Sequence, residues 1–248
     1  MKELKEFFMQ EGGVPMYVVF LSLLLIFYTV NSVMAALEIK KQQDAPVTEK
    51  EKCRTYFQSI IALWGAVFVV FIMCFIGKIS LEDIGFRQIR FNYGFWFTAV
   101  TLALSGLFLA NGLYNLIFSL VSAKFRKTEA KKTPGVEMLP RSKKEKWIFS
   151  FVALSAGICE EIVFRGFLLF LILSIFPNIP IYLIVLIPSA LFGIWHLYQG
   201  LKGVIGTAIL GALCVCLYLV TDSLILVMLL HFCTDLVATF LVSEGDME

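Results

Sequence analysis

The chain alternates long runs of apolar residues with short breaks that contain charged residues, proline or glycine. A helix that crosses the hydrocarbon core of a bilayer needs about 20 predominantly apolar residues. The pattern therefore predicts an all-α fold, a polytopic integral membrane helical bundle of about seven transmembrane helices, with eight as the alternative count. The seven runs fall at residues 14–37, 56–77, 93–121, 147–176, 180–199, 203–220 and 223–242.

The fourth run, residues 147–176, is longer than a crossing requires. At 1.5 Å per residue a helix of this length would extend about 45 Å. It must project beyond the hydrocarbon or break, and we expect a break at Ser155-Ala156-Gly157, where three small residues follow one another.

Composition supports a membrane protein and excludes a solvated globular domain. Apolar residues make up 59% of the 248 residues and charged residues 16%, against about 45–50% and about 25% in soluble domains. The lipid bilayer is thus a predicted partner. The net charge of +2 comes with no basic stripe, so no nucleic-acid partner is predicted. Most of the six cysteines lie within apolar runs, which argues against a disulfide framework.

Basic residues in the breaks predict the orientation of the chain. Residues 38–55 and 122–146 carry 5 and 9 basic side chains, and with Lys202 their side totals 15 against 5 on the other. Because Lys and Arg are retained on the cytoplasmic side, we expect the N-terminus outside and the C-terminus in the cytoplasm. An eighth membrane segment would place one of the two termini on the opposite side of the membrane. Residues 80–91 are interpreted either as a short interfacial helix or as a polar loop.

Six polar side chains stand out because they lie within the apolar runs. Each charged residue at the centre of a membrane helix costs about 2.5–3.5 kcal/mol on insertion scales, so such residues are functional-site candidates. The six are Glu160, Glu161, Arg165, His196, His231 and Asp235.

Helical spacing separates their roles. Glu161 precedes Arg165 by four residues, so the two can form an ion pair on one helix face. Glu160 points about 100° away from Glu161 and has no local cation. His231 and Asp235 are also one turn apart, so that the carboxylate can hold one ring nitrogen.

One carboxylate and two imidazoles supply what hydrolysis of an amide by water needs. One group takes a proton from water, one stabilises the oxyanion and one returns a proton to the leaving amine. Glu160, His196 and His231 are the candidates. Two alternatives to hydrolysis are structural hydrogen bonds between helices and a proton relay in a transporter. A cysteine nucleophile at Cys159 or Cys233 is less favoured, because an apolar setting lowers thiol reactivity.

Three motifs together resemble the CAAX-processing and bacteriocin-processing (CPBP, or Abi) family of intramembrane proteases. They are Glu160-Glu161-x-x-x-Arg165, Phe192-x-x-x-His196 and His231-x-x-x-Asp235. The resemblance divides the single membrane domain into N-terminal helices with basic cytoplasmic loops at 1–146, a CPBP/Abi-type catalytic region at 147–242, and a short acidic tail at 243–248.

The resemblance implies a CAAX-protease-like intramembrane endopeptidase that acts on a membrane-associated or hydrophobic peptide or protein. It also implies a multi-pass protein of the cell membrane, and the length and pattern suggest a bacterial plasma membrane. Glu160 would activate water with help from His196, His231 would serve the oxyanion, and Arg165 would position Glu160 and Glu161. The competing hypotheses are a non-catalytic immunity or scaffolding protein of the same fold and a proton-coupled transporter.

Two features of the motifs leave the mechanism open. CAAX-processing relatives usually have Asn where this chain has Asp235, and an ionised carboxylate only accepts hydrogen bonds. We therefore expect Asp235 to orient His231 rather than to donate to an oxyanion. Glu160, His196 and His231 form a set that could bind zinc, but the chain lacks His-Glu-x-x-His. No cofactor is favoured, and a zinc-dependent mechanism is the alternative.

Overall fold

The computed structural model describes residues 16–42, 47–131, 133 and 135–244. Every regular element within these residues is a helix, which confirms the predicted all-α class. The elements are α2 (Met16–Gln42), α3 (Glu49–Ile76), α4 (Phe95–Val121), α5 (Ala123–Ala130), η1 (Val136–Met138), α6 (Lys143–Glu161), η2 (Ile162–Leu168), α7 (Leu169–Ile175), α8 (Ile181–Ile194), η3 (Leu197–Gln199), α9 (Gly200–Thr221) and α10 (Leu224–Ala238).

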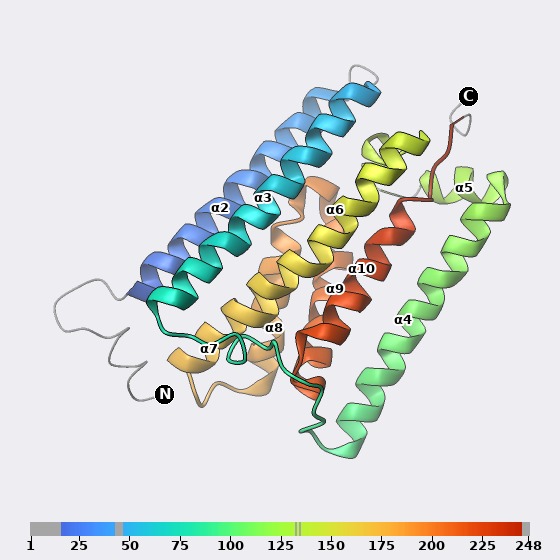
Figure 1. The fold of residues 1–248 in the computed structure, drawn as a ribbon. Coiled ribbons are helices and arrows are strands. Elements are labelled where there is room, and N and C mark those ends of the chain that lie inside the picture. The colour runs from blue at the N-terminus through green and yellow to red at the C-terminus, as the bar shows by residue number, and fades with distance from the viewer. Residues whose placement is uncertain (1–15, 43–46, 132, 134, 245–248) are drawn as a thin grey trace.

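The long helices lie side by side as a bundle (Figure 1), and each predicted apolar run contains one. Helix α6 lies between α3 and α10, α8 packs along α9, and α4 flanks α9 and α10. Among the described residues, three helices are long and apolar enough to cross a membrane, namely Glu49–Ile76, Phe95–Val121 and Leu197–Thr221. The total of seven or eight crossings stays a prediction.

The expected break at Ser155-Ala156-Gly157 is wrong. Helix α6 is continuous through these residues, and the irregularity comes later, where η2 is a π-helix. The small residues serve close packing instead, because a Cβ added at Gly157 would lie 2.8 Å from the backbone nitrogen of Phe232 in α10. Turns of π-helix occur frequently at functional sites, and this one directly follows the two adjacent glutamates.

Residues 77–94 form the polar loop rather than an interfacial helix. Ser80 and Asp83 form the reciprocal hydrogen bonds that are typical of the start of a helix. The Asp83 backbone N–H donates to the Ser80 hydroxyl oxygen, and the Ser80 hydroxyl donates to Asp83 Oδ2 over 2.7 Å. Only turns follow these residues. The loop is held against the α9–α10 turn by an Arg87–Asp222 ion pair of 3.0 Å and by the Ser223 hydroxyl, which donates to the Arg87 carbonyl. These contacts fix the start of α10, the helix that carries His231.

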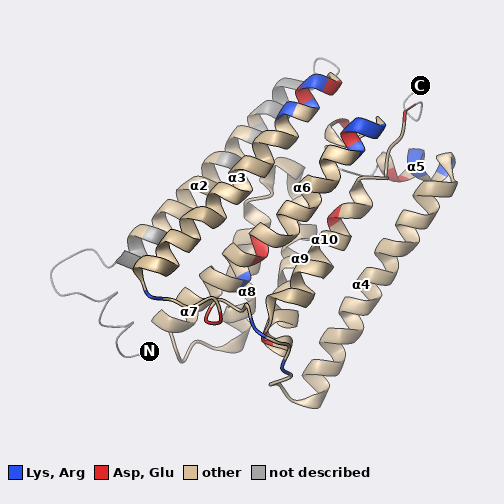
Figure 2. Ribbon diagram, in the orientation of Figure 1, with Lys and Arg blue, Asp and Glu red and all other residues tan. Residues whose placement is uncertain are grey.

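The basic segment 122–146 contains α5, η1 and the first turn of α6. Figure 2 shows its charges at the same end of the bundle as the charged first turns of α3. Lys52 from α3 is buried there. Its ammonium donates to the Leu139 carbonyl over 2.9 Å and lies 3.7 Å from Glu145, which caps α6. This contact joins α3, the loop and α6 at the end predicted to be cytoplasmic.

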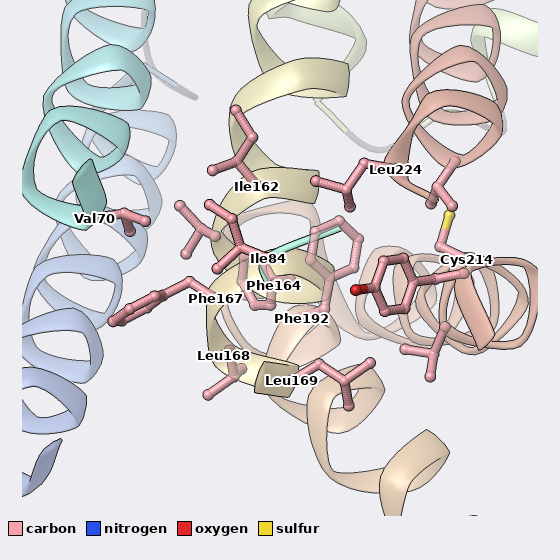
Figure 3. Close-up of a cluster of buried hydrophobic side chains, with 14 of the residues drawn as sticks. Val70, Ile84, Ile162, Phe164, Phe167, Leu168, Leu169, Phe192, Cys214 and Leu224 are labelled. Atoms are coloured by element: carbon pink, nitrogen blue, oxygen red, sulfur yellow. The ribbon is translucent and has the colours of Figure 1, made fainter. Parts of the chain in front are cut away.

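The main core lies around η2, below the glutamates. All seven residues of η2 are buried. Figure 3 shows side chains from α3, the 77–94 loop, η2, α8, α9 and α10 meeting in one cluster. Phe164 packs edge-on against Phe192 with ring centroids 5.0 Å apart. This packing sets η2 firmly against α8 and so fixes the position of the polar groups on both.

The close contact between α6 and α10 generates a stability prediction. We expect Gly157→Ala to lower the free energy of unfolding by about 1–3 kcal/mol, because the added methyl group would collide with the Phe232 backbone. Thermal unfolding in detergent micelles measures the change. Gly106→Ala in α4 is the matched control, since nothing lies within 4 Å of a Cβ there. Equal melting temperatures for the two variants would contradict the predicted helix contact.

Candidate functional site

The six predicted polar residues come from four parts of the fold. Glu160 and Glu161 end α6, Arg165 lies in η2, His231 and Asp235 lie in α10, and His196 directly precedes η3. Figure 2 shows acidic positions on α6 and α10, and a basic position below them, deep between the apolar helices. The bundle therefore brings charged groups together in its interior.

Glu161 is the centre of this polar network. Its Oε1 atom accepts a hydrogen bond of 2.8 Å from Arg165 Nη1 and lies 2.6 Å from His231 Nδ1. The side chains of Glu161 and Arg165 are both 0% exposed. The ion pair expected from the spacing of four residues is thus present. One carboxylate oxygen joins the α6–η2 helix to α10.

Arg165 has further contacts that compensate its burial. Its Nη2 atom donates to the Gly211 carbonyl of α9 over 3.0 Å, and its guanidinium lies 4.7 Å from the centroid of the Phe192 ring. A buried charge needs such hydrogen bonds and ring contacts, because removal from water is costly. Arg165 therefore ties α9 and α8 to the same carboxylate.

His231 is oriented mainly by Glu161 rather than by Asp235. A carboxylate accepts, so Nδ1–H donates to Glu161 and Nε2 is the free nitrogen. Nε2 lies 3.5 Å from Asp235 and 3.8 Å from Glu160. The expectation for Asp235 used only neighbours on its own helix, whereas the shorter contact comes from another helix. Asp235 instead faces the same nitrogen as Glu160.

Glu160 is the carboxylate that no cation neutralises directly. Its side chain is 13% exposed. Its Oε2 atom is buried and has no hydrogen-bond partner among the described residues. This atom lies 3.8 Å from His231 Nε2. Glu160 is therefore available to a bound molecule, whereas Glu161 uses its Oε1 atom for Arg165 and His231, and only its Oε2 atom has no partner among the described residues.

His196 and His231 both contact the ring of Phe192. Its Nδ1 atom is 2.7 Å from the Phe192 carbonyl, which can only accept, so Nδ1–H donates and Nε2 carries the lone pair. The Phe192 ring centroid is 4.7 Å from that of His196 and 5.8 Å from that of His231. Glu160 and His231 thus lie close together, and the Phe192 ring contacts both imidazoles.

The arrangement does not fit a preformed metal site. Among the described residues, no group of three histidine, cysteine or acidic side chains is placed to hold an ion. Zinc requires ligand distances of about 2.0–2.2 Å from three such groups at once. We derive no step through a metal.

The buried ion pair generates a second stability prediction. Arg165→Met should destabilise the protein by about 3–5 kcal/mol, because it leaves the Glu161 carboxylate buried without its cation. The double variant Glu161→Gln, Arg165→Met should recover part of the loss, since no charge is then left unpaired. Chemical denaturation in micelles measures both. Arg87→Met, which breaks a partly exposed pair, is the control and should cost about 0–1 kcal/mol. Equal effects at Arg87 and Arg165 would contradict the role given to burial.

Comparison with known proteins agrees with this geometry. A family model described as type II CAAX prenyl endopeptidase Rce1-like matches residues 142–237, from the cap of α6 to the end of α10. No curated protein and no solved structure gave a significant match. The family and the apolar helices together point to a multi-pass membrane protein with a CAAX-protease-like hydrolase domain. Residues 142–237, which contain all six polar residues, therefore belong to the Rce1-like group of the CPBP family.

Proposed function

We propose that the protein is an intramembrane endopeptidase that cleaves a membrane-associated or hydrophobic peptide with water activated by Glu160. The observation that carries the proposal is the buried, unpartnered Oε2 atom of Glu160, 3.8 Å from Nε2 of an imidazole that Glu161 holds in place. A base within reach of a fixed imidazole is the arrangement that general acid–base catalysis requires.

The reaction is a balanced hydrolysis. Glu160 takes a proton from water while the water oxygen forms a bond to the carbonyl carbon of the substrate, and the carbonyl electron pair moves to oxygen. His231 in its doubly protonated form donates a hydrogen bond from Nε2–H to this oxyanion. The oxyanion electron pair then returns to re-form the carbonyl as the carbon–nitrogen bond breaks, the electrons of that bond stay on nitrogen, and nitrogen receives the proton held by Glu160. The products are a carboxylic acid terminus and an amine.

The remaining residues position these groups in the proposal. Arg165 and Glu161 fix the direction of the His231 ring from the Nδ1 side. Asp235, 3.5 Å from Nε2, helps to hold that nitrogen and interacts with the cationic ring. His196, with its Nε2 lone pair free, assists proton transfer near Glu160. Each of these roles uses a hydrogen-bonding capacity that the residue has in its observed contacts.

The location of the site restricts the substrate class. The polar groups lie within a bundle whose outer surface is largely apolar. A peptide that reaches them must be apolar itself or be held at the membrane. The matching family model is named for CAAX prenyl endopeptidases, and we extend to this chain only cleavage of a membrane-bound peptide. We place the protein in the cell membrane and propose a bacterial plasma membrane.

Cleavage should depend on Glu160. We expect Glu160→Gln to lower turnover by about 10²–10⁴-fold, because an amide cannot accept the proton from water. The purified protein in liposomes is incubated with membrane peptides, and mass spectrometry identifies new termini that the variant does not produce. Glu82→Gln, at an exposed position in the 77–94 loop, is the control and should cleave normally.

Three outcomes separate the competing functions. Termini formed only when Glu160 is intact support catalysis. A folded Glu160→Gln variant that keeps the cellular phenotype, with no cleavage by either form, would favour an immunity or scaffolding protein. Proton flux in liposomes that is lost in the variant would favour a transporter.

Activity should survive removal of metal ions. Because the described site lacks three ligands arranged around a common point, we expect exhaustive chelation to leave the cleavage rate unchanged within about twofold, less than a general acid or base contributes. The rate is measured before chelation, after chelation and after addition of Zn²⁺. Complete loss on chelation and recovery with Zn²⁺ would contradict a mechanism that is free of metal.

A further inference from the structure

A tyrosine from outside the matched segment packs against the helical turn that follows the glutamates. Tyr28 belongs to α2, whereas the family model begins at residue 142. Its phenol oxygen is buried and has no hydrogen-bond partner among the described residues. A buried hydroxyl without a partner is costly and rare in folded proteins, and a catalytic role or a bound water molecule is a common reason for it. Tyr28 therefore requires an explanation.

The Tyr28 ring is held firmly by aromatic contacts. It stacks on Trp195, with ring centroids 4.9 Å apart and an interplanar angle of 24°, and meets Phe164 edge-on at 5.3 Å. Trp195 in turn donates from Nε1 to the Thr29 hydroxyl over 3.3 Å. Trp195 directly precedes His196. The phenol is thus fixed to the same turn that carries a predicted catalytic imidazole.

The hydroxyl of Tyr28 and the carboxylate of Glu160 are complementary. The Tyr28 ring packs against Phe164, which follows Glu160 by four residues along the same α6–η2 helix. The phenol can donate and the carboxylate can accept, and both atoms are buried without partners in the described part of the chain. No direct hydrogen bond joins them. A small molecule that accepts from one and donates to the other would satisfy both, and water has this capacity.

Tyr198 is a second phenol near the site, with its ring centroid 5.7 Å from that of His196. Its oxygen accepts a hydrogen bond from Gln199 Nε2 over 3.2 Å. It therefore has a partner that explains its position without a bound molecule. The Tyr28 hydroxyl has no such partner among the described residues. For this reason we assign the role to Tyr28 rather than to Tyr198.

We propose that the Tyr28 hydroxyl donates a hydrogen bond to the water molecule that Glu160 deprotonates, so that α2 completes the catalytic site. The inference rests on the proposed protease function. Tyr28 keeps its own proton throughout, the proton of water passes to Glu160, and no further reactant is needed. The hydroxyl orients the water oxygen toward the substrate carbonyl.

The test removes only the hydroxyl. We expect Tyr28→Phe to lower kcat by about 10- to 100-fold, in the range of a lost preorganised donor, and to leave KM unchanged within about twofold. The probe is a fluorogenic form of the peptide whose cleavage depends on Glu160. Tyr56→Phe is the matched control, since Tyr56 is a buried tyrosine whose hydroxyl donates to the Met138 carbonyl at the far end of the bundle. It should lower the melting temperature but not kcat.

The outcomes distinguish this inference from the proposed function. A drop in kcat at Tyr28→Phe with unchanged KM and melting temperature supports it. Normal kcat in Tyr28→Phe, while Glu160→Gln is inactive, overturns the role of Tyr28 and leaves the protease intact. A fall in kcat that merely follows a lowered melting temperature, as a structural role would give, overturns it as well. Normal cleavage by Glu160→Gln would instead overturn the protease proposal.

Discussion

The site depends on the buried oxygen of Glu161 that contacts both Arg165 and His231. Two charges removed from water are costly unless their hydrogen bonds are well satisfied. The two terminal nitrogens of Arg165 donate to Glu161 and to the Gly211 carbonyl, and its guanidinium lies over the Phe192 ring, while its Nε atom has no partner among the described residues. The same network joins η2, α8, α9 and α10, so the position of the His231 ring follows from the packing of the whole catalytic region. Movement of any one of these helices would disturb the ring.

The π-helix makes this network compatible with the core. It begins at Ile162, directly after Glu161, and all seven of its residues are buried. A wider turn places the guanidinium of Arg165 and the rings of Phe164 and Phe167 in the same packed layer. Gly166 permits the 77–94 loop to approach, since a Cβ there would lie 2.8 Å from the Ile84 carbonyl oxygen. An irregular helix is retained where the close approach of several segments stabilises it.

Some of this arrangement could be predicted from the sequence, and the rest could not. The apolar runs locate the long helices, and the spacing of four residues locates the Glu161–Arg165 pair, because both signals are local. The bond between Glu161 and His231 joins residues 70 positions apart, and no periodicity indicates it. The run of small residues at Ser155-Ala156-Gly157 equally suits a break or a close helix crossing. Only the neighbouring Phe232 backbone decides between them.

Two adjacent glutamates acquire different properties because a helix turns them toward different surroundings. Glu161 faces Arg165 and His231 and is completely enclosed, so its charge is compensated and its Oε1 atom is occupied, while its Oε2 atom has no hydrogen-bond partner among the described residues. Glu160, about 100° away around the helix, faces an imidazole nitrogen and retains a free, buried oxygen. Pairs of titratable groups with contrasting environments are typical of acid–base sites. The paired carboxylate holds the imidazole in place, which leaves the unpaired one as the group that can accept a proton from a substrate water.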